Sequence, residues 1–444
     1  MEVVKKQVLK NGIFQVLTVR PFFLMMLSEL FSQIAFNMQH FVLIFIIYGF
    51  THSNTAVSGM ILSFMIPAVL LSVISGVYTD RWNKKKVLWI THLLRATLLL
   101  PFLIPNLHLS LIYLFTFLIA VVTQFFMPAE SSIIPQLVPK KLIVSANAVF
   151  SFSIFGMILA GYILSGPVLL FLGRTYTIIL LISFFLIGAV VVSGIKIEDK
   201  KKKIIGQANP FPAKTNFSFS KEAGEVFVFI KKARRVMHAL FMITIAQSVI
   251  FMFAVLAPGY VATVLQVPFE SLSVILVAPA GVGLGIGAFV LGSKCKEIGH
   301  LLVSAVGFMI VGVIFFFMPF MGKVVSYGWV QNLNSFLPNI LHINILHVII
   351  LMAFIVGIGM SFVFVPSNST IQIETNEEMR GRMYGLLNSL IGAVSFLPVI
   401  LVGGLADLFS VGTVIGGVGI ILIAVSIYYL FFIEFNQNKL KIVN

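Results

Sequence analysis

Long runs without a charged residue divide the chain, and short polar segments separate them. No Asp, Glu, Lys or Arg occurs between residues 29 and 80 or between residues 382 and 407. Such runs reach or exceed the roughly 20 apolar residues that an α-helix needs to cross a bilayer. Turn signals cut the longest runs further, the first at Thr51-His52-Ser53-Asn54-Thr55. The pattern therefore predicts an all-α membrane protein with twelve transmembrane helices.

The twelve helices fall into two sets of six on either side of a basic segment. They cover about residues 21–48, 56–78, 87–106, 109–128, 146–171, 175–195, 237–264, 271–293, 300–320, 345–366, 384–407 and 411–433. We expect two six-helix bundles, residues 1–195 and 237–444, joined by a basic cytoplasmic linker at 196–236. The segment before 21 is basic, but the apolar run after it is too long for a cleavable signal peptide.

Composition excludes a soluble enzyme. Hydrophobic residues make up 59% of the chain and charged residues 10%, whereas soluble domains carry about 25% charged residues. The single cysteine, Cys295, excludes an internal disulfide and a cysteine-rich metal site. The eight histidines are scattered, with no cluster at catalytic spacing. We expect no metal, no cofactor and no enzymatic activity.

The net charge of +15 reflects membrane topology. Of the 30 Lys and Arg residues, only Arg174 and Lys323 fall on one side of the predicted helices, and Arg95 lies within a span. Because basic residues collect in cytoplasmic loops, both termini are predicted to be cytoplasmic in a multi-pass protein of the plasma membrane. The basic linker is better explained by anionic lipid headgroups than by nucleic acid. Within it, residues 218–235 form either an interfacial amphipathic helix or a solvated linker. The loop 322–344 is either an interfacial hairpin or a lid.

Three formally charged residues fall within predicted spans: Glu29, Arg95 and Asp407. Charges inside the membrane are costly and mark functional sites by default. Glu29 is our first candidate for proton coupling, with Arg95 as its neighbour on the third helix. The alternatives are a structural ion pair between the two, or an Arg95 side chain that reaches the lipid headgroups. For Asp407, helix capping is favoured over substrate contact.

Polar side chains also line the first predicted helix, where they must face protein or water. Several share one helical stripe, which predicts the wall of a substrate cavity. His40, near mid-membrane, is a further candidate for protonation. The candidates for the cavity are Ser32, Gln33 and Asn37 on this helix, with Gln124 and Tyr162 on two others.

One loop motif is specific enough to indicate a family. The segment between the second and third helices reads Gly76-Val-Tyr-Thr-Asp80-Arg81-Trp-Asn83-Lys84-Lys85-Lys86. It resembles the cytoplasmic-loop signature of the major facilitator superfamily, with Asn83 where glycine is usual. The resemblance implies the major facilitator fold, two pseudo-symmetric six-helix bundles, and a conformational-switch role for Gly76, Asp80, Arg81, Lys84 and Lys85.

Two other stretches, 128–148 and 372–382, resemble the efflux branch that contains macrolide exporters, the enterobactin exporter and the lysophospholipid transporter. The resemblance implies cytoplasmic gate residues at Glu130, Arg380 and Arg382. Pro128-Ala-Glu-Ser-Ser also aligns with Pro366-Ser-Asn-Ser-Thr, which is typical of two halves related by an axis along the membrane normal.

Two departures from antiporter patterns bear on the mechanism. Tyr162 follows Gly161, where a proline is usual in the fifth helix, and the fourth helix lacks the arginine of many drug–proton antiporters; its most polar residue is Gln124. We nevertheless expect an alternating-access secondary transporter that exports hydrophobic or amphipathic, drug- or macrolide-like compounds against protons, as a monomer among membrane lipids. The alternatives are a lysophospholipid flippase, with Arg95 at the headgroup, a siderophore exporter, a non-transporting receptor and a membrane enzyme.

Overall fold

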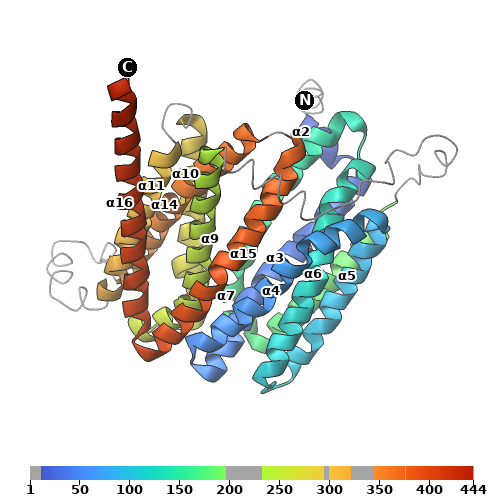
Figure 1. Ribbon diagram of the computed structural model, residues 1–444. Helices are drawn as coiled ribbons and strands as arrows, with labels where there is room; N and C mark the ends of the chain where they lie inside the picture. The colour runs from blue at the N-terminus through green and yellow to red at the C-terminus, as the bar shows by residue number, and fades with distance from the viewer. Residues whose placement is uncertain (1–11, 197–232, 295–299, 322–344, 376, 444) are drawn as a thin grey trace, which may run out of the picture. The chain divides into compact units, whose positions relative to one another are not determined.

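The computed structural model describes residues 12–196, 233–294, 300–321, 345–375 and 377–443. Every regular element in these ranges is helical (Figure 1). Within them, eleven helical segments are long and apolar enough to cross a membrane. The structure therefore confirms the all-α membrane fold. The predicted linker and the loop 322–344 lie mostly or wholly outside the described residues.

The longest apolar segment accounts for two of the predicted spans. Residues Lys140–Ser193 form a stretch of 54 residues, which at about 1.5 Å per residue exceeds twice the bilayer core. Helix α7 (Ile143–Ser193) breaks at Gly173, where φ is 68° and ψ is 175°. This conformation is essentially restricted to glycine. The break falls between the fifth and sixth predicted spans, so the segment crosses twice.

The chain forms two compact units that we describe separately. Unit 1 comprises Met1–Gln39, Leu70–Gly161 and Arg174–Phe229, and unit 2 comprises His40–Val69, Tyr162–Gly173 and Ile230–Asn444. The two predicted domains, residues 1–195 and 237–444, divide the chain by its sequence order, and this division stays a prediction.

Helices of the first sequence half supply unit 1 and part of unit 2. They are α2 (Gly12–Leu17), α3 (Arg20–Thr51), α4 (Asn54–Arg81), α5 (Lys84–Leu99), α6 (Leu109–Leu137) and α7, with the short 3₁₀ helices η1 (Leu100–Leu103) and η2 (Lys140–Leu142). The apolar core of unit 1 includes Phe22, Leu88 and Ile133. The structure gives a role to the asparagine at position 83, where the family signature has glycine. The Asn83 side-chain Oδ1 accepts a hydrogen bond from the backbone N–H of Lys86 and caps α5.

The second half forms the remaining helices, all in unit 2. They are α9 (Arg234–Tyr260), α10 (Ala278–Lys294), α11 (His300–Phe317), α14 (Ile345–Glu374), α15 (Glu377–Leu408) and α16 (Val411–Val443), with η4 (Val261–Leu265), η5 (Phe269–Ser271), η6 (Ser273–Val277) and η7 (Met318–Phe320). Helix α10 packs along α14, α11 contacts α14 and α16, and α15 contacts α9. Small residues permit the close α10–α14 contact. A Cβ atom on Gly283 or Gly357 would run into the backbone of the facing helix.

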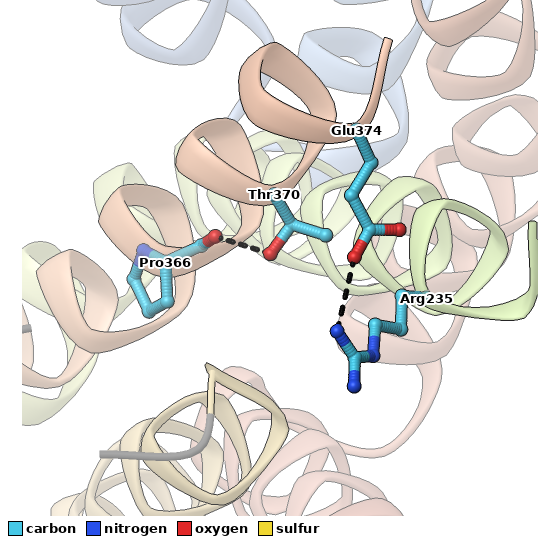
Figure 2. A network of polar contacts seen from close by, with 4 residues as sticks. All are labelled: Arg235, Pro366, Thr370 and Glu374. Carbon is cyan, nitrogen blue, oxygen red and sulfur yellow. Dashed lines mark hydrogen bonds and ion pairs between the residues drawn. The ribbon is translucent and has the colours of Figure 1, made fainter. Parts of the chain in front are cut away.

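Two helices continue beyond the apolar spans that the sequence predicted. Helix α6 runs past Pro128 to Leu137, and α14 runs past Pro366 to Glu374. Each of these two prolines removes one backbone donor from its helix. Beyond Pro366, the Thr370 hydroxyl donates a 2.9 Å hydrogen bond to the Pro366 carbonyl, as Figure 2 shows. The continuation of α6 determines where Glu130 points.

Candidate functional site

A cluster of polar and charged side chains lies inside unit 1, on three helices. Ser28 and Glu29 come from α3, His92 and Arg95 from α5, and Glu130 from α6, and none of the five is more than 3% exposed. Three of the five carry a formal charge when ionised: two carboxylates and one guanidinium. Burial of charged groups is costly unless they are paired, so this cluster is the candidate functional site.

A chain of hydrogen bonds connects Arg95 to α7. An Nη2 of Arg95 lies 3.4 Å from Nδ1 of His92, and Nε2 of His92 lies 3.1 Å from the Ser28 hydroxyl. The Ser28 hydroxyl donates to the carbonyl of Gly188 at 3.2 Å. Because arginine has no acceptor, Nδ1 of His92 accepts from Arg95 and Nε2–H donates to Ser28. The geometry therefore corresponds to a neutral imidazole.

Aromatic rings fix the guanidinium of Arg95. Its Cζ atom lies 4.0 Å from the ring centroid of Phe126 and 4.7 Å from that of Phe185. Each such contact stabilises a cation by about 0.5–2 kcal/mol. Nε also donates to the Thr91 carbonyl at 3.4 Å. The alternative in which Arg95 extends to the lipid headgroups is therefore wrong.

The carboxyl groups of Glu29 and Glu130 are buried within electrostatic reach of each other and of the Arg95 guanidinium. Both oxygens of Glu29 and Oε1 of Glu130 are buried without a partner from any donor. Glu29 makes no direct ion pair with Arg95, since the ion pair found in the described part of the chain is Arg235–Glu374.

Glycine at position 188 is a requirement of the cluster. A Cβ atom there would lie 2.8 Å from Cε1 of His92. Sequence reasoning named neither residue as functional. The available signal was the three-residue separation of His92 and Arg95, which places both side chains on one face of a helix.

The other candidates on the first helix, α3, are buried and follow Glu29 closely in the sequence. Gln33 and Asn37 lie one and two turns beyond Glu29, and Nδ2 of Asn37 donates to the Gln33 carbonyl at 2.7 Å. The buried Ser32 hydroxyl has no hydrogen-bonding partner in the described structure. A Cβ on Gly161 would lie 2.9 Å from Cβ of Asn37, so Gly161 lets α7 approach α3 there.

The remaining cavity and protonation candidates are dispersed. Gln124 is half-buried on α6 in unit 1, and Tyr162 is half-buried in unit 2. His40 is buried in unit 2 with its ring 4.7 Å from that of Phe64. Their roles in a cavity or in proton transfer stay predictions.

The predicted switch loop is described in part. Lys85 donates from Nζ to the Ser193 carbonyl at 2.8 Å, and Lys84 to the Trp82 carbonyl at 3.4 Å. A Cβ on Gly76 would meet open space. The backbone of Asp80 and Arg81 forms the last turn of α4, and that of Arg380 and Arg382 the start of α15; these four side chains are outside the described structure.

Asp407 lies at the end of α15 and caps another helix. Its carboxylate accepts hydrogen bonds from the backbone N–H groups of Asn54 and Thr55, at 2.8 and 3.0 Å. These are among the first donors of α4, which have no partner within their own helix. The structure thus supports capping, the favoured alternative for this residue.

The second half has no equivalent of the buried carboxyl pair at the aligned position. Asn368 corresponds to Glu130, and its Nδ2 donates to the Phe364 carbonyl at 2.9 Å, while its Oδ1 accepts from the Tyr384 hydroxyl at 3.2 Å. Near the end of the same helix, Arg235 contacts Glu374 at 3.4 Å (Figure 2). The Arg235 side chain is 83% exposed, so the pair contributes at most about 1 kcal/mol.

Known proteins resemble the chain over nearly its whole length. The MFS-type transporter YfmI of Bacillus subtilis (strain 168) is 22% identical over 428 residues, covering 95% of this chain and 98% of YfmI. YvqJ, an MFS-type transporter of the same organism, is 24% identical over 391 residues, covering 83% and 81%.

Solved structures show the same fold. A POT family transporter in complex with a thioalcohol-conjugated peptide has a TM-score of 0.67 at 13% identity, covering 94% of this chain and 96% of that one. For the nucleoside transporter NupG the TM-score is 0.66 at 13% identity, with 91% and 99% covered. A bacterial homologue of the human lysosomal transporter Spinster gives 0.67 at 11% identity, with 92% and 95% covered.

The whole-chain relatives, the helical architecture and the switch-loop motif agree with one another. The family model of the Major Facilitator Superfamily matches residues 25–397. The chain therefore belongs to the Major Facilitator Superfamily, a family of multi-pass membrane transporters and not of enzymes.

Proposed function

We propose that the protein is a secondary transporter of the plasma membrane that works by alternating access. In this proposal it exports hydrophobic or amphipathic small molecules in exchange for protons. The observation that carries the coupling is the burial of Glu29 and Glu130 within electrostatic reach of each other and of the Arg95 cation. Two carboxylates and one guanidinium leave one negative charge in a buried site unless one proton is bound.

One proton resolves this arrangement. A protonated carboxyl of either residue donates a hydrogen bond to the other, which removes the unpartnered acceptor and the excess charge together. Release of that proton leaves a buried negative charge, which favours a conformation in which water reaches the cluster. Proton binding and release are thereby coupled to conformation. Under this proposal Glu130 acts with Glu29, in addition to its predicted place near the cytoplasmic gate.

The substrate class is proposed from what the membrane-spanning helices lack. Within the described spans, fixed charge away from the helix ends is confined to the cluster, and Arg95 is enclosed by rings. A headgroup site at Arg95, which a lysophospholipid flippase would use, is therefore not supported by the geometry. Peptide and nucleoside transporters share the fold, and their substrates belong in the same test as macrolides, siderophores and lysophospholipids.

The coupling experiment uses proteoliposomes in which substrate flux is driven either by an imposed pH gradient or by substrate counterflow. We expect Glu29→Gln to abolish accumulation driven by the pH gradient and to keep counterflow, because exchange of substrate alone needs no net proton movement. Glu130→Gln is expected to behave alike.

The matched control is Glu374→Gln, which removes a partly exposed carboxylate outside the cluster. It should retain both modes of transport. Gradient-driven accumulation that survives in both Glu29→Gln and Glu130→Gln would remove the carboxyl pair from the mechanism. If the wild-type protein shows no counterflow with any of the compound classes, this would instead contradict the transport assignment for those substrates.

A further inference from the structure

The imidazole of His92 is confined by its neighbours to one position inside unit 1. Its ring centroid lies 5.1 Å from that of Phe126 on α6 and 6.3 Å from that of Phe185 on α7. The side chain is fully buried, at 0% exposure. A Cβ atom on Gly188 would lie 2.8 Å from Cε1 and 3.1 Å from Nδ1 of the ring, so glycine at position 188 leaves just enough room for it.

The hydrogen bonds of His92 also fix which ring nitrogen faces Arg95 as an acceptor. The Ser28 hydroxyl uses its one proton on the Gly188 carbonyl, so it accepts from Nε2–H of His92 and cannot donate to the ring. In a neutral imidazole with Nε2 protonated, Nδ1 carries a free lone pair. That lone pair faces Nη2 of Arg95 at 3.4 Å.

Every direct partner of the Arg95 guanidinium is uncharged. These partners are the His92 imidazole, a backbone carbonyl and two aromatic rings. Glu29 and Glu130 lie within electrostatic reach, yet neither forms an ion pair with Arg95 in the described part of the chain. A buried arginine with two carboxyl groups nearby would ordinarily pair with one of them directly. A contact that holds the guanidinium elsewhere is therefore required.

The other elements around His92 bring no competing charge. The titratable side chains that face the site are Glu29 from α3 and Glu130 from α6. Helix α7 contributes the Gly188 carbonyl, and its one charged residue, Arg174, lies about 21 Å away along the helix axis.

We propose that His92 is a positioning residue that keeps the Arg95 guanidinium from pairing directly with Glu29 or Glu130. The inference rests on the proton coupling proposed above and assigns it a further residue. An arginine in direct contact with a carboxylate favours the ionised form strongly. By engaging Arg95 through Nδ1, His92 prevents a direct ion pair from displacing the proton on the carboxyl pair. His92 itself stays neutral and carries no proton across the membrane.

The first test changes the acceptor at position 92 and records the pH at which gradient-driven transport is half-maximal. His92→Phe keeps an aromatic ring but removes the acceptor, so Arg95 turns to the carboxylates. We expect the midpoint to fall by about one pH unit or more. His92→Asn should stay close to the wild-type midpoint, because its Oδ1 is bonded to Cγ, as Nδ1 is, and can accept from Arg95. His238→Phe, at a half-buried histidine beside Tyr429 in unit 2, is the matched control and should not move the midpoint.

The second test moves the imidazole without changing it. Gly188→Ala places a methyl group against Cε1 of His92 and should shift the midpoint in the same direction as His92→Phe. Asparagine has no atom equivalent to Cε1, so Gly188→Ala added to His92→Asn should cause little further shift. This non-additivity is the signature of a role exerted through the ring. Substrate counterflow in each variant verifies the fold.

A readout without transport separates this proposal from the coupling itself. The apolar reagent dicyclohexylcarbodiimide modifies protonated carboxyl groups, and mass spectrometry gives the pH midpoint of modification at Glu29 and Glu130. A midpoint that falls in His92→Phe and Gly188→Ala but not in His92→Asn supports the positioning role. If modification titrates in the wild-type protein and keeps the same midpoint in His92→Phe, the positioning role is overturned and the proton site stands. Wild-type modification that does not vary with pH would contradict the proton site, and the positioning role with it.

Discussion

The guanidinium of Arg95 is held by contacts of three kinds: two aromatic faces, the imidazole of His92 and the field of two carboxyl groups. Only the last of these depends on ionisation. Under the proposed coupling, the rings and the imidazole keep the cation in place while the carboxyl pair binds and releases a proton. In that proposal Arg95 is a fixed counter-charge, and the mobile charge of the cluster is the proton.

We predict the effect of removing the Arg95 cation. Arg95→Met leaves the carboxyl pair without a counter-charge and should lower the free energy of unfolding by about 3–5 kcal/mol, the usual cost of breaking a buried charge arrangement. Thermal denaturation in detergent measures it. Arg235→Met, at an exposed ion pair, should lower stability by less than about 1 kcal/mol. Addition of Glu29→Gln to Arg95→Met should recover part of the loss; a stable Arg95→Met protein would contradict the role given to the cation.

Residue-level sequence reasoning found Glu29 and Arg95 because a charge inside an apolar span is conspicuous. It placed Glu130 at a cytoplasmic gate because of the family resemblance of residues 128–148, which follow the predicted fourth span. Helix α6 continues for nine residues past Pro128, to Leu137, and Glu130 on this continuation is buried in unit 1. Burial of this kind depends on the packing partner and leaves no trace in local hydropathy.

Helix α10 owes its contact with α14 to glycines on one side only. A Cβ on Gly283 would meet the Phe354 backbone, whereas a Cβ on Gly285 would meet open space. We therefore predict that Gly283→Ala lowers the free energy of unfolding by about 1–3 kcal/mol, as overpacking does. Gly285→Ala should leave it unchanged or raise it slightly, because alanine favours helix. Equal melting temperatures for the two variants would show that α10 adjusts without cost.

The helices could be predicted from the sequence because membrane-spanning segments are long and lack charged residues. The break at Gly173 falls between the predicted spans ending at 171 and beginning at 175, since glycine and the neighbouring Arg174 both interrupt the apolar pattern. The sequence did not predict the α4–α15 contact. Only the structure shows that Gly403 and Asp407 contact the start of α4.

The orientation of the whole molecule is a prediction that the sequence makes through charge. If basic loops are cytoplasmic, Cys295, between Lys294 and Lys296, faces the cytoplasm, and the loop around His108 faces outward. A membrane-impermeant maleimide should then label the wild-type protein in inside-out vesicles and not in intact cells. The variant Cys295→Ser with His108→Cys, at an exposed position, should show the opposite pattern. Labelling of Cys295 from outside would invert the predicted topology.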